Sequence, residues 1–382
     1  MKYDIQEVCK KFGKLIGNDI RDTWNLLNEP NFLDTISGPV AYRVNNVDAS
    51  PAGANITSNA NYYLLIDWIT DSDVKRFISD LEKALDLRHI RKDYVLVLIN
   101  RNLALPQTEI KFVNTDFLMY KVGLHFNQQS KKFYKDLSFL TDKRERRILS
   151  LNRRLNNCWH RVLLLALSSK HKLFENNYIT YNLDPEFDSE IPPLDELINL
   201  TAQPKGSYNL ISQKELYTEM DTLVKNKKNV YESFSHESPG YIFTVRDETI
   251  DIYKSSYISL VTETFFYEDD YIITEKVYKP IIHYHPFIVL GSPYTLKHMR
   301  SIGFKTFGDF WDESYDEEEN NDTRFEKVFN LLMKFDKMPI EELHKLYIEM
   351  IPTLKYNYDL IVGRGSMKQL TENLEKNITE EK

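Results

Sequence analysis

The sequence predicts an α/β protein of two domains, and three observations support this fold class. The chain has 382 residues, whereas about 100–200 residues is usual for one domain. Short, continuously apolar segments alternate with longer amphipathic ones, as buried strands alternate with helices. Gly and Pro number only 12 and 14, which disfavours turn-dense all-β, collagen-like and linker-rich proteins.

The first half, residues 1–144, is expected to form one α/β domain. We expect a helix in IQEVCKKFGKLI and then irregular chain up to about residue 60. YYLLIDW and YVLVLINR are predicted strands with the helix DSDVKRFISDLEKALDL between them, and IKFVNTDFLMYKV holds one or two more. Apolar strands separated by helices predict a parallel sheet covered on both faces.

The pattern restarts in residues 145–335, the second predicted domain. RILSL is a predicted strand, NRRLNNCW a polar loop and HRVLLLALSS a helix. A further helix is expected near SQKELYTEMDTLVKN, and YISLVTET, PFIVLGS and GFKTF are predicted strands with helices between them. We therefore expect two Rossmann-like domains that face each other across a cleft.

Residues 336–382 are predicted to form a helical tail that packs near the domain junction. Pro339 stands where a helix is expected to begin, and Pro352 where the next is expected to be interrupted. The acidic run WDESYDEEENND comes before this tail, and such a run is usually a solvated face, although DESYD could also line the cleft.

Composition excludes several functional classes. The net charge of −8 gives no overall basic field for nucleic acid, although a local basic cleft is compatible with it. Cys9 and Cys158 provide neither a disulfide framework nor zinc spacing. Charges interrupt every apolar run in the first residues, so we expect no signal peptide there. No apolar stretch is long enough to span a bilayer. We expect a cytoplasmic protein, in the host cytoplasm if it is encoded by a phage; its oligomeric state stays open.

A basic loop at a strand-to-helix junction is the first candidate site. Its residues are Asn152, Arg153, Arg154, His160 and Arg161. Guanidinium groups bind phosphate oxygens in forks, and a helix amino terminus adds partial positive charge. The alternative is a solvated basic face or a strip that pairs with the other domain.

The second candidate site combines a strand end with a helix start. Glu263 follows a predicted strand that ends at Val261, and Thr274, Glu275 and Lys276 open the next helix. A carboxylate can accept from ribose hydroxyls, while Lys and free N–H groups bind phosphate. The alternative is a capped helix with a surface Glu–Lys pair.

Two neighbouring features are more ambiguous. Gly291 and Ser292 are predicted to form a strand-to-helix turn that lines the same site. His283 and His285 could both bind a metal, but no third ligand accompanies them at suitable spacing, so we expect no metal site there.

The segment ETFF…DYIITEKVYKP…PFIVLG, within residues 257–295, resembles the donor-binding segment of GT-B glycosyltransferases. The α-1,3-fucosyltransferase family is similar, with FEN, DYxTEK and VPVVLG in these places. The likeness extends loosely to the NRR…HR loop and to DESYD, a combination found in glycosyltransferase-like proteins of phages and bacteria. VTET replaces FEN here, so the resemblance specifies neither the sugar nor the nucleotide base.

The resemblance implies a GT-B fold and transfer of a sugar from a nucleoside diphosphate sugar to a hydroxyl acceptor, with inversion. Glu263 and Glu275 would bind ribose or sugar hydroxyls, and Lys276 the diphosphate. No cofactor is expected beyond this co-substrate, and no metal, because no Asp-x-Asp motif stands at a strand end. Asp67, at the end of the predicted strand YYLLIDW, and Asp116, after FVNT, are the candidates for the catalytic base, although such strand-end acids also cap helices.

Three alternatives remain open. A phage-type enzyme that glycosylates hydroxylated or hydroxymethylated DNA bases would share the donor half and differ in its acceptor. A non-catalytic nucleotide-sugar-binding protein would lack the base. An unrelated α/β enzyme would bind another phosphorylated ligand.

Overall fold

The computed structural model contains two compact units. One comprises Met1–Gln128, Pro239–Thr244 and Ile361–Lys382, and the other Gln129–Ser238 and Val245–Leu360. The domain limits expected from the sequence stay predictions, because compactness alone does not say which residues act together. The structure describes residues 41–44, 62–66, 78–79, 82, 86, 92, 95–99, 108–114, 134, 136–152, 155, 158–181, 210–226, 247–267, 273–364, 372 and 376.

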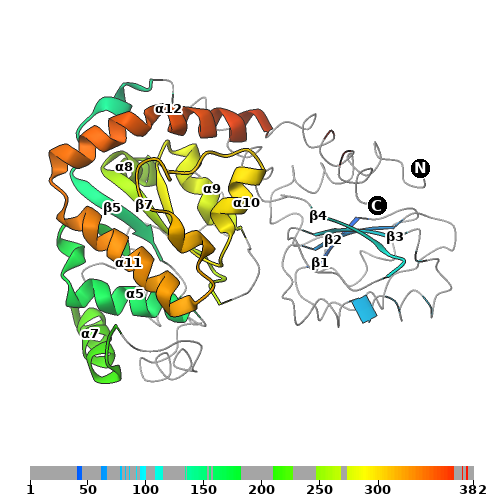
Figure 1. The fold of residues 1–382 in the computed structure, drawn as a ribbon, viewed down its shortest axis with the longest axis horizontal. Coiled ribbons are helices and arrows are strands. Elements are labelled where there is room, and N and C mark those ends of the chain that lie inside the picture. Colours follow the sequence, from blue (N-terminus) through cyan, green and yellow to red (C-terminus); the bar gives the residue numbers. More distant parts are fainter. Residues whose placement is uncertain are drawn as a thin grey trace. The chain divides into compact units, whose positions relative to one another are not determined.

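A four-stranded parallel sheet lies in the amino-terminal unit (Figure 1). Its strands are β1 (Ala41–Val44), β2 (Tyr62–Ile66), β3 (Val95–Ile99) and β4 (Lys111–Asn114), adjacent in that order. The parallel arrangement expected from the apolar runs is confirmed. β1 lies in the stretch that we expected to be irregular, because its four residues are placed by pairing with β2, which local propensity does not report.

The predicted helix between β2 and β3 is present at its described residues, 78, 79, 82 and 86. Ile78 is buried, and Glu82 accepts a hydrogen bond of 2.7 Å from the hydroxyl of Thr108, which precedes β4. Val97 and Val113, on neighbouring strands, are both fully buried. The described part of this unit therefore has a sheet core with a helix attached to it.

The second unit also has a four-stranded parallel sheet. Its strands are β5 (Arg146–Leu151), β6 (Tyr178–Thr180), β7 (Ser256–Thr262) and β8 (Phe287–Leu290), in the spatial order β6-β5-β7-β8. The chain moves from β5 to one neighbour, β6, and then crosses to the other side for β7. This reversal makes the carboxyl ends of β5 and β7 the topological switch point, where open α/β sheets bind ligands.

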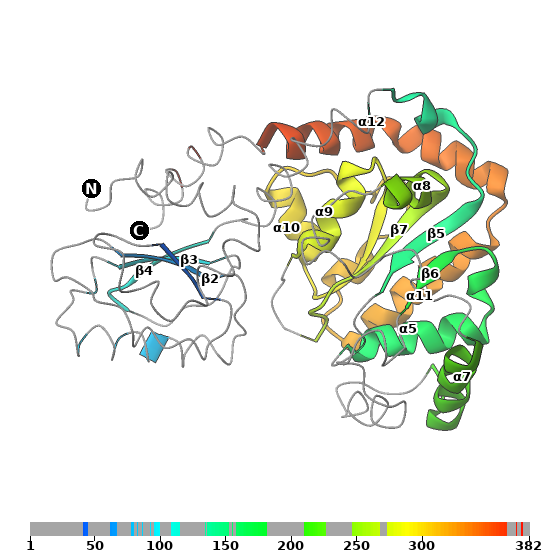
Figure 2. The same cartoon turned by 180° about the vertical axis from the view of Figure 1, so that it is seen from behind.

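Helices cover both faces of this sheet (Figures 1 and 2). The α-helices of the unit are α5 (Trp159–Lys170), α7 (Gln213–Asn226), α8 (Asp247–Lys254), α9 (Glu275–Ile282), α10 (Thr295–Ser301), α11 (Asn321–Lys337) and α12 (Ile340–Arg364). α8 and α9 pack on β7, whereas α11 packs on β5 and β8, beside α5. α5 is buried around its whole circumference from Trp159 to Ser168, because α7 covers the side that a surface helix would expose.

Two details differ from the sequence prediction. GFKTF is not a strand, because Gly303 has φ 94° and ends α10 with paired bonds from its own N–H to Arg300 O and from Phe304 N–H to Met299 O. Pro352 lies inside α12 and does not end it. The helix therefore continues at the expense of one main-chain hydrogen bond.

Buried polar groups lie at the amino edge of the sheet, next to the first residues of β5 and β7. Arg144 is 3% exposed and donates to the main-chain oxygens of Tyr253 and Ser256, at 2.7 Å each. It also donates to the hydroxyl of Tyr347, which in turn donates to Tyr284 O at 2.8 Å. Burial lowers the pKa of Arg144. These bonds fix α12 to the start of β5 and β7.

His283 and His285 belong to this buried edge. His283 stacks on Tyr253, with ring centroids 4.0 Å apart, and hydrogen-bonds to the hydroxyl of Tyr134. His285 Nε2 donates to Ser256 O at 2.6 Å, while its Nδ1 pairs with the hydroxyl of Ser259 at 2.7 Å. Burial, with a smaller contribution from Lys279, lowers the pKa of His283 to about 3. Both rings are therefore neutral core groups.

A stability test follows from these histidines. The unfolded chain protonates His283 below about pH 6.5, whereas the folded protein resists protonation down to about pH 3. The contribution of His283 to the free energy of unfolding therefore has its full value above about pH 6.5. It decreases by about 1.4 kcal/mol per pH unit as the pH falls toward about 3. In urea unfolding at pH 7.5, 6.0 and 4.5, His283→Phe should lose less stability below pH 6.5 than the parent. Parallel losses in the two proteins would contradict the assignment.

Candidate functional site

The candidate site lies at the carboxyl edge of the second sheet, where β5 and β7 end side by side. β5 is followed by Asn152, and β7 by Glu263. The hydroxyl of Thr262 donates to Asn152 Oδ1 at 2.6 Å, and Asn152 Nδ2 donates to the hydroxyl of Ser150 at 3.0 Å. Asn152 is fully buried. This side chain therefore joins the two strand ends.

The first turn of α5 holds the end of β7 through main-chain oxygens. Arg161 Nη2 donates to Thr262 O at 2.7 Å, and His160 Nε2 donates to Glu263 O at 2.8 Å. Arg161 is 3% exposed and His160 is 1% exposed. Burial, followed by the charge of Arg161, lowers the pKa of His160 to about 3, so this ring is neutral. These contacts position the strand end, and phosphate binding by Arg161 stays a prediction.

Glu263 is a fully buried carboxylate with donors on both oxygens. Oε1 accepts from Thr274 N at 2.9 Å, and Oε2 accepts from the hydroxyl of Thr274 at 2.6 Å and from Thr264 N at 3.2 Å. Burial raises its pKa, while the charge of Lys276 and the bonds from Thr274 oppose that increase. Glu263 thus joins the two ends of the loop between β7 and α9.

The first turn of α9 carries one partly exposed charge, Lys276, beside one buried charge, Glu275. Thr274 is the N-cap, and its hydroxyl accepts from Lys276 N at 3.3 Å. Lys276 Nζ lies 3.3 Å from Glu275 Oε1 and 3.1 Å from the hydroxyls of Thr264 and Thr274. Its side chain is 27% exposed, against 9% for Glu275. Among the predicted binding residues with described side chains, Lys276 therefore offers a ligand the most accessible cation.

Glu275 is ionised despite its burial. Burial raises its pKa, but Lys276 and Lys279 outweigh this effect and the net pKa is lowered. The pKa of Lys279 is itself lowered, first by burial. The first turn therefore combines the carboxylate of Glu275 with the ammonium of Lys276 at the start of a helix, where the backbone also attracts anions, and Lys279 adds a charge from the last turn.

Gly291 and Ser292 form the turn after β8, as the sequence predicts. A Cβ on Gly291 would lie 3.2 Å from the Cβ of Glu263 and 3.3 Å from Cγ1 of Val289. The hydroxyl of Ser292 donates to Phe265 O at 3.2 Å. The absence of a side chain at Gly291 therefore allows the end of β8 to approach the end of β7 closely.

Sequence reasoning missed Arg324 on α11, which fixes both loops. The residue is 1% exposed; Nε donates to Gly291 O at 3.0 Å, and Nη2 donates to Phe266 O. Its guanidinium lies 4.5 Å from the ring centroid of Phe266, which also stacks on His160 at 4.9 Å. Burial lowers the pKa of Arg324 to about 10, so it stays cationic at neutral pH. The available signal was an arginine on the apolar stripe of α11, four residues before Val328.

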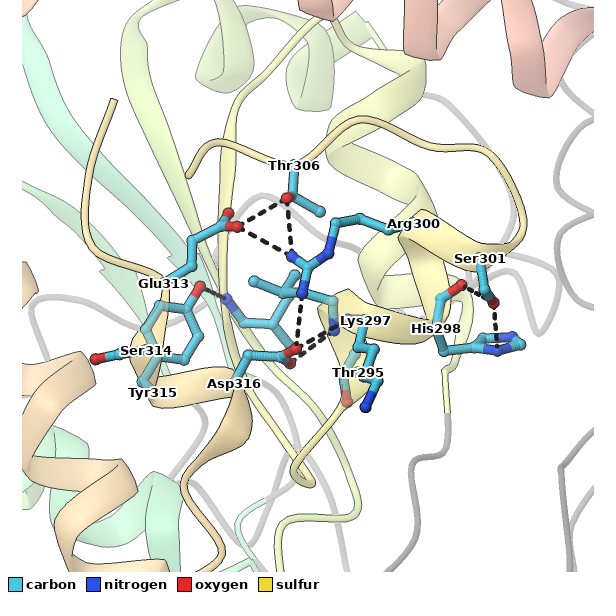
Figure 3. A network of polar contacts seen from close by, with 12 residues as sticks. Thr295, Lys297, His298, Arg300, Ser301, Thr306, Glu313, Ser314, Tyr315 and Asp316 are labelled. Carbon is cyan, nitrogen blue, oxygen red and sulfur yellow. Dashed lines mark hydrogen bonds and ion pairs between the residues drawn. The ribbon is translucent and has the colours of Figure 1, made fainter. Parts of the chain in front are cut away.

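The segment DESYD is only partly exposed to solvent, whereas an acidic run usually forms a solvated face (Figure 3). Asp316 is buried and accepts from Leu296 N at 2.7 Å and Lys297 N at 2.8 Å, which caps α10 from outside the helix. Glu313 accepts from the hydroxyl of Thr306 and from Phe307 N, both at 2.7 Å. Arg300 pairs with both carboxylates. Asp316 therefore holds a helix end and Glu313 a loop, and their side chains are only 2% and 9% exposed.

Several predicted site residues lie outside the described residues. They are Arg153, Arg154, Asp67 and Asp116. Their proposed roles stay predictions.

Comparison with protein-family models, with curated proteins and with solved structures finds no match to this chain. Within the described residues, no three His, Cys, Asp or Glu side chains come together as a metal site. None of the described helices is long and apolar enough to cross a membrane. The functional interpretation therefore rests on the geometry of the sheet edge.

The close approach at Gly291 can be tested by adding one methyl group. Gly291→Ala brings a carbon against the Cβ of Glu263, which the strand holds in place, so we expect a loss of about 1–3 kcal/mol in unfolding free energy. Gly308→Ala is the matched control, because its new methyl meets the carboxylate end of Glu313 at 3.3 Å. Urea unfolding should show the larger loss for Gly291→Ala. Equal losses would contradict the tight-contact argument.

Proposed function

We propose that the second unit binds a nucleoside diphosphate sugar at this sheet edge and that the protein transfers the sugar to a hydroxyl acceptor. The observation that carries the proposal is the position of Lys276. Its partly exposed ammonium stands in the first turn of a helix that begins beside the topological switch point. This is where an α/β sheet receives phosphorylated ligands.

The charges of the turn suit such a ligand. The ammonium of Lys276 and the amino end of α9 would attract diphosphate, and the ionised Glu275 would accept from ribose or sugar hydroxyls. The resemblance of the TEK segment to fucosyltransferases gives the same two residues these roles. A GT-B fold, with the donor half after residue 145, belongs to this proposal.

The proposed reaction forms a bond from the acceptor oxygen to the anomeric carbon and breaks the bond from that carbon to diphosphate oxygen. The acceptor proton passes to a base, and the departing diphosphate carries the negative charge away. Lys276 would stabilise that developing charge, which is why we expect transfer without a divalent metal. We assign the base to Asp67 or Asp116 in the first half of the chain.

Lys276 offers a direct test of donor binding. Thermal-shift and calorimetric titrations with UDP, GDP, ADP and dTDP should identify at least one ligand. At one hundred times its dissociation constant, that ligand should stabilise the parent by about 2.7 kcal/mol. Lys276→Met should bind it about 10- to 150-fold more weakly, because a charge-assisted hydrogen bond contributes about 1.5–3 kcal/mol.

Lys297→Met is the matched control for Lys276→Met. Lys297 also lies in the first turn of a helix after a strand, but that strand is β8 and does not border the switch point. The Lys297→Met variant should bind the nucleotide with the same affinity as the parent. Absence of binding by all four nucleotides, or equal affinities for parent and Lys276→Met, would refute the proposed site.

The catalytic half of the proposal is tested by the two aspartates. Asp67→Asn and Asp116→Asn should both leave nucleotide affinity within about twofold of the parent. One of them should lower sugar-transfer turnover by about a hundredfold or more, the usual contribution of a general base. Activity should persist in EDTA. Full activity in both variants would place the base elsewhere, and restoration of EDTA-abolished activity by magnesium or manganese would overturn the metal-free mechanism.

A further inference from the structure

The carboxylate of Glu263 is closed to a ligand in this structure. The residue has 0% exposure, and its two oxygens already accept three hydrogen bonds, from Thr264 and Thr274. Its main-chain oxygen accepts from His160, and its Cβ lies against Gly291. Both the backbone and the side chain of Glu263 are therefore held from the protein side.

The same three bonds determine where the ammonium of Lys276 lies. The hydroxyl of Thr274 donates its proton to Glu263, so its lone pairs are left to face Lys276 N at 3.3 Å and Lys276 Nζ at 3.1 Å. Thr264, whose N–H also donates to Glu263, places its hydroxyl 3.1 Å from the same Nζ. Both hydroxyls that contact the ammonium thus belong to residues held by one buried carboxylate.

We infer that Glu263 is a positioning residue, which fixes the ammonium of Lys276 through Thr264 and Thr274, and that the ligand meets Lys276 and Glu275 instead. This inference rests on the proposed function for the identity of the ligand. It replaces the expectation that Glu263 itself contacts the nucleotide sugar.

A double-mutant cycle separates positioning from direct contact. Glu263→Gln has the same size, but its amide nitrogen cannot accept from Thr264 or Thr274. With whichever of UDP, GDP, ADP and dTDP binds the parent as the probe, Glu263→Gln should weaken binding by about tenfold or more in the parent and by less than about twofold in Lys276→Met, since coupled residues are not additive. Equal weakening in both backgrounds would show that Glu263 contacts the ligand directly and would overturn the inference.

Amide hydrogen exchange on the intact chain tests the same inference without ligand. In Glu263→Gln, amides of residues 264–276 should exchange about tenfold faster or more, because glutamine keeps one acceptor oxygen and the N–H of either Thr264 or Thr274 loses its partner. Glu313→Gln is the matched control: Glu313, with 9% of its side chain exposed, is another carboxylate that accepts from a loop N–H and a threonine hydroxyl. This control should leave 264–276 protected and accelerate exchange near Phe307.

The outcomes of the two experiments are distinguishable. If none of UDP, GDP, ADP and dTDP binds the parent, the proposed function fails, and exchange alone decides the positioning role. Faster exchange confined to 264–276 then supports that role, and unchanged exchange overturns it. If Glu263→Gln does not fold, Thr274→Val removes the hydroxyl while it keeps the side-chain shape. This variant should show the same local acceleration of exchange and the same coupling to Lys276, and the absence of both effects would overturn the inference.

Discussion

The carboxyl edge of the second sheet depends on one buried carboxylate. An ionised group without water is costly unless hydrogen bonds replace its hydration. Glu263 accepts three such bonds from Thr264 and Thr274 at the two ends of one loop, so these ends cannot separate without leaving buried oxygens unsatisfied. The start of α9, and hence the position of Lys276, follows from this constraint. Gly291 supports it by leaving space for the Cβ of Glu263.

Charged side chains elsewhere in this unit are used in the same way. Arg144, Arg161 and Arg324 are each buried, and each donates to main-chain oxygens at the end of a strand or in a loop. Asp316 does the converse and accepts from the free N–H groups of α10. Backbone groups beyond the sheet and the helices still need partners when they are buried. Full charges supply strong partners at both edges of the sheet.

Sequence periodicity predicted much of this fold but not all of its polar contacts. The apolar runs that become β2, β3, β5, β7 and β8 are evident because strands of parallel sheets are rich in Val, Ile and Leu. β1 was missed because it depends on pairing with β2. GFKTF was misassigned because its aromatic residues are buried from a loop that follows a left-handed glycine. The role of Arg324 depends on carbonyl groups 33 and 58 residues away along the chain, which no local pattern reports.

The two interpretations of the TEK segment, a capped helix and a ligand site, turn out to be compatible. Thr274 is an N-cap, and its hydroxyl also borders the ammonium of Lys276. A helix cap alone would not need a neighbouring buried carboxylate, because the threonine hydroxyl oxygen by itself accepts from a free N–H of the first turn. Glu263 adds a buried carboxyl group whose pKa is raised by burial, and this group lies at the switch point of the sheet. A buried ionisable group that lowers stability is typical of a functional site, where geometry matters more than the contribution to folding.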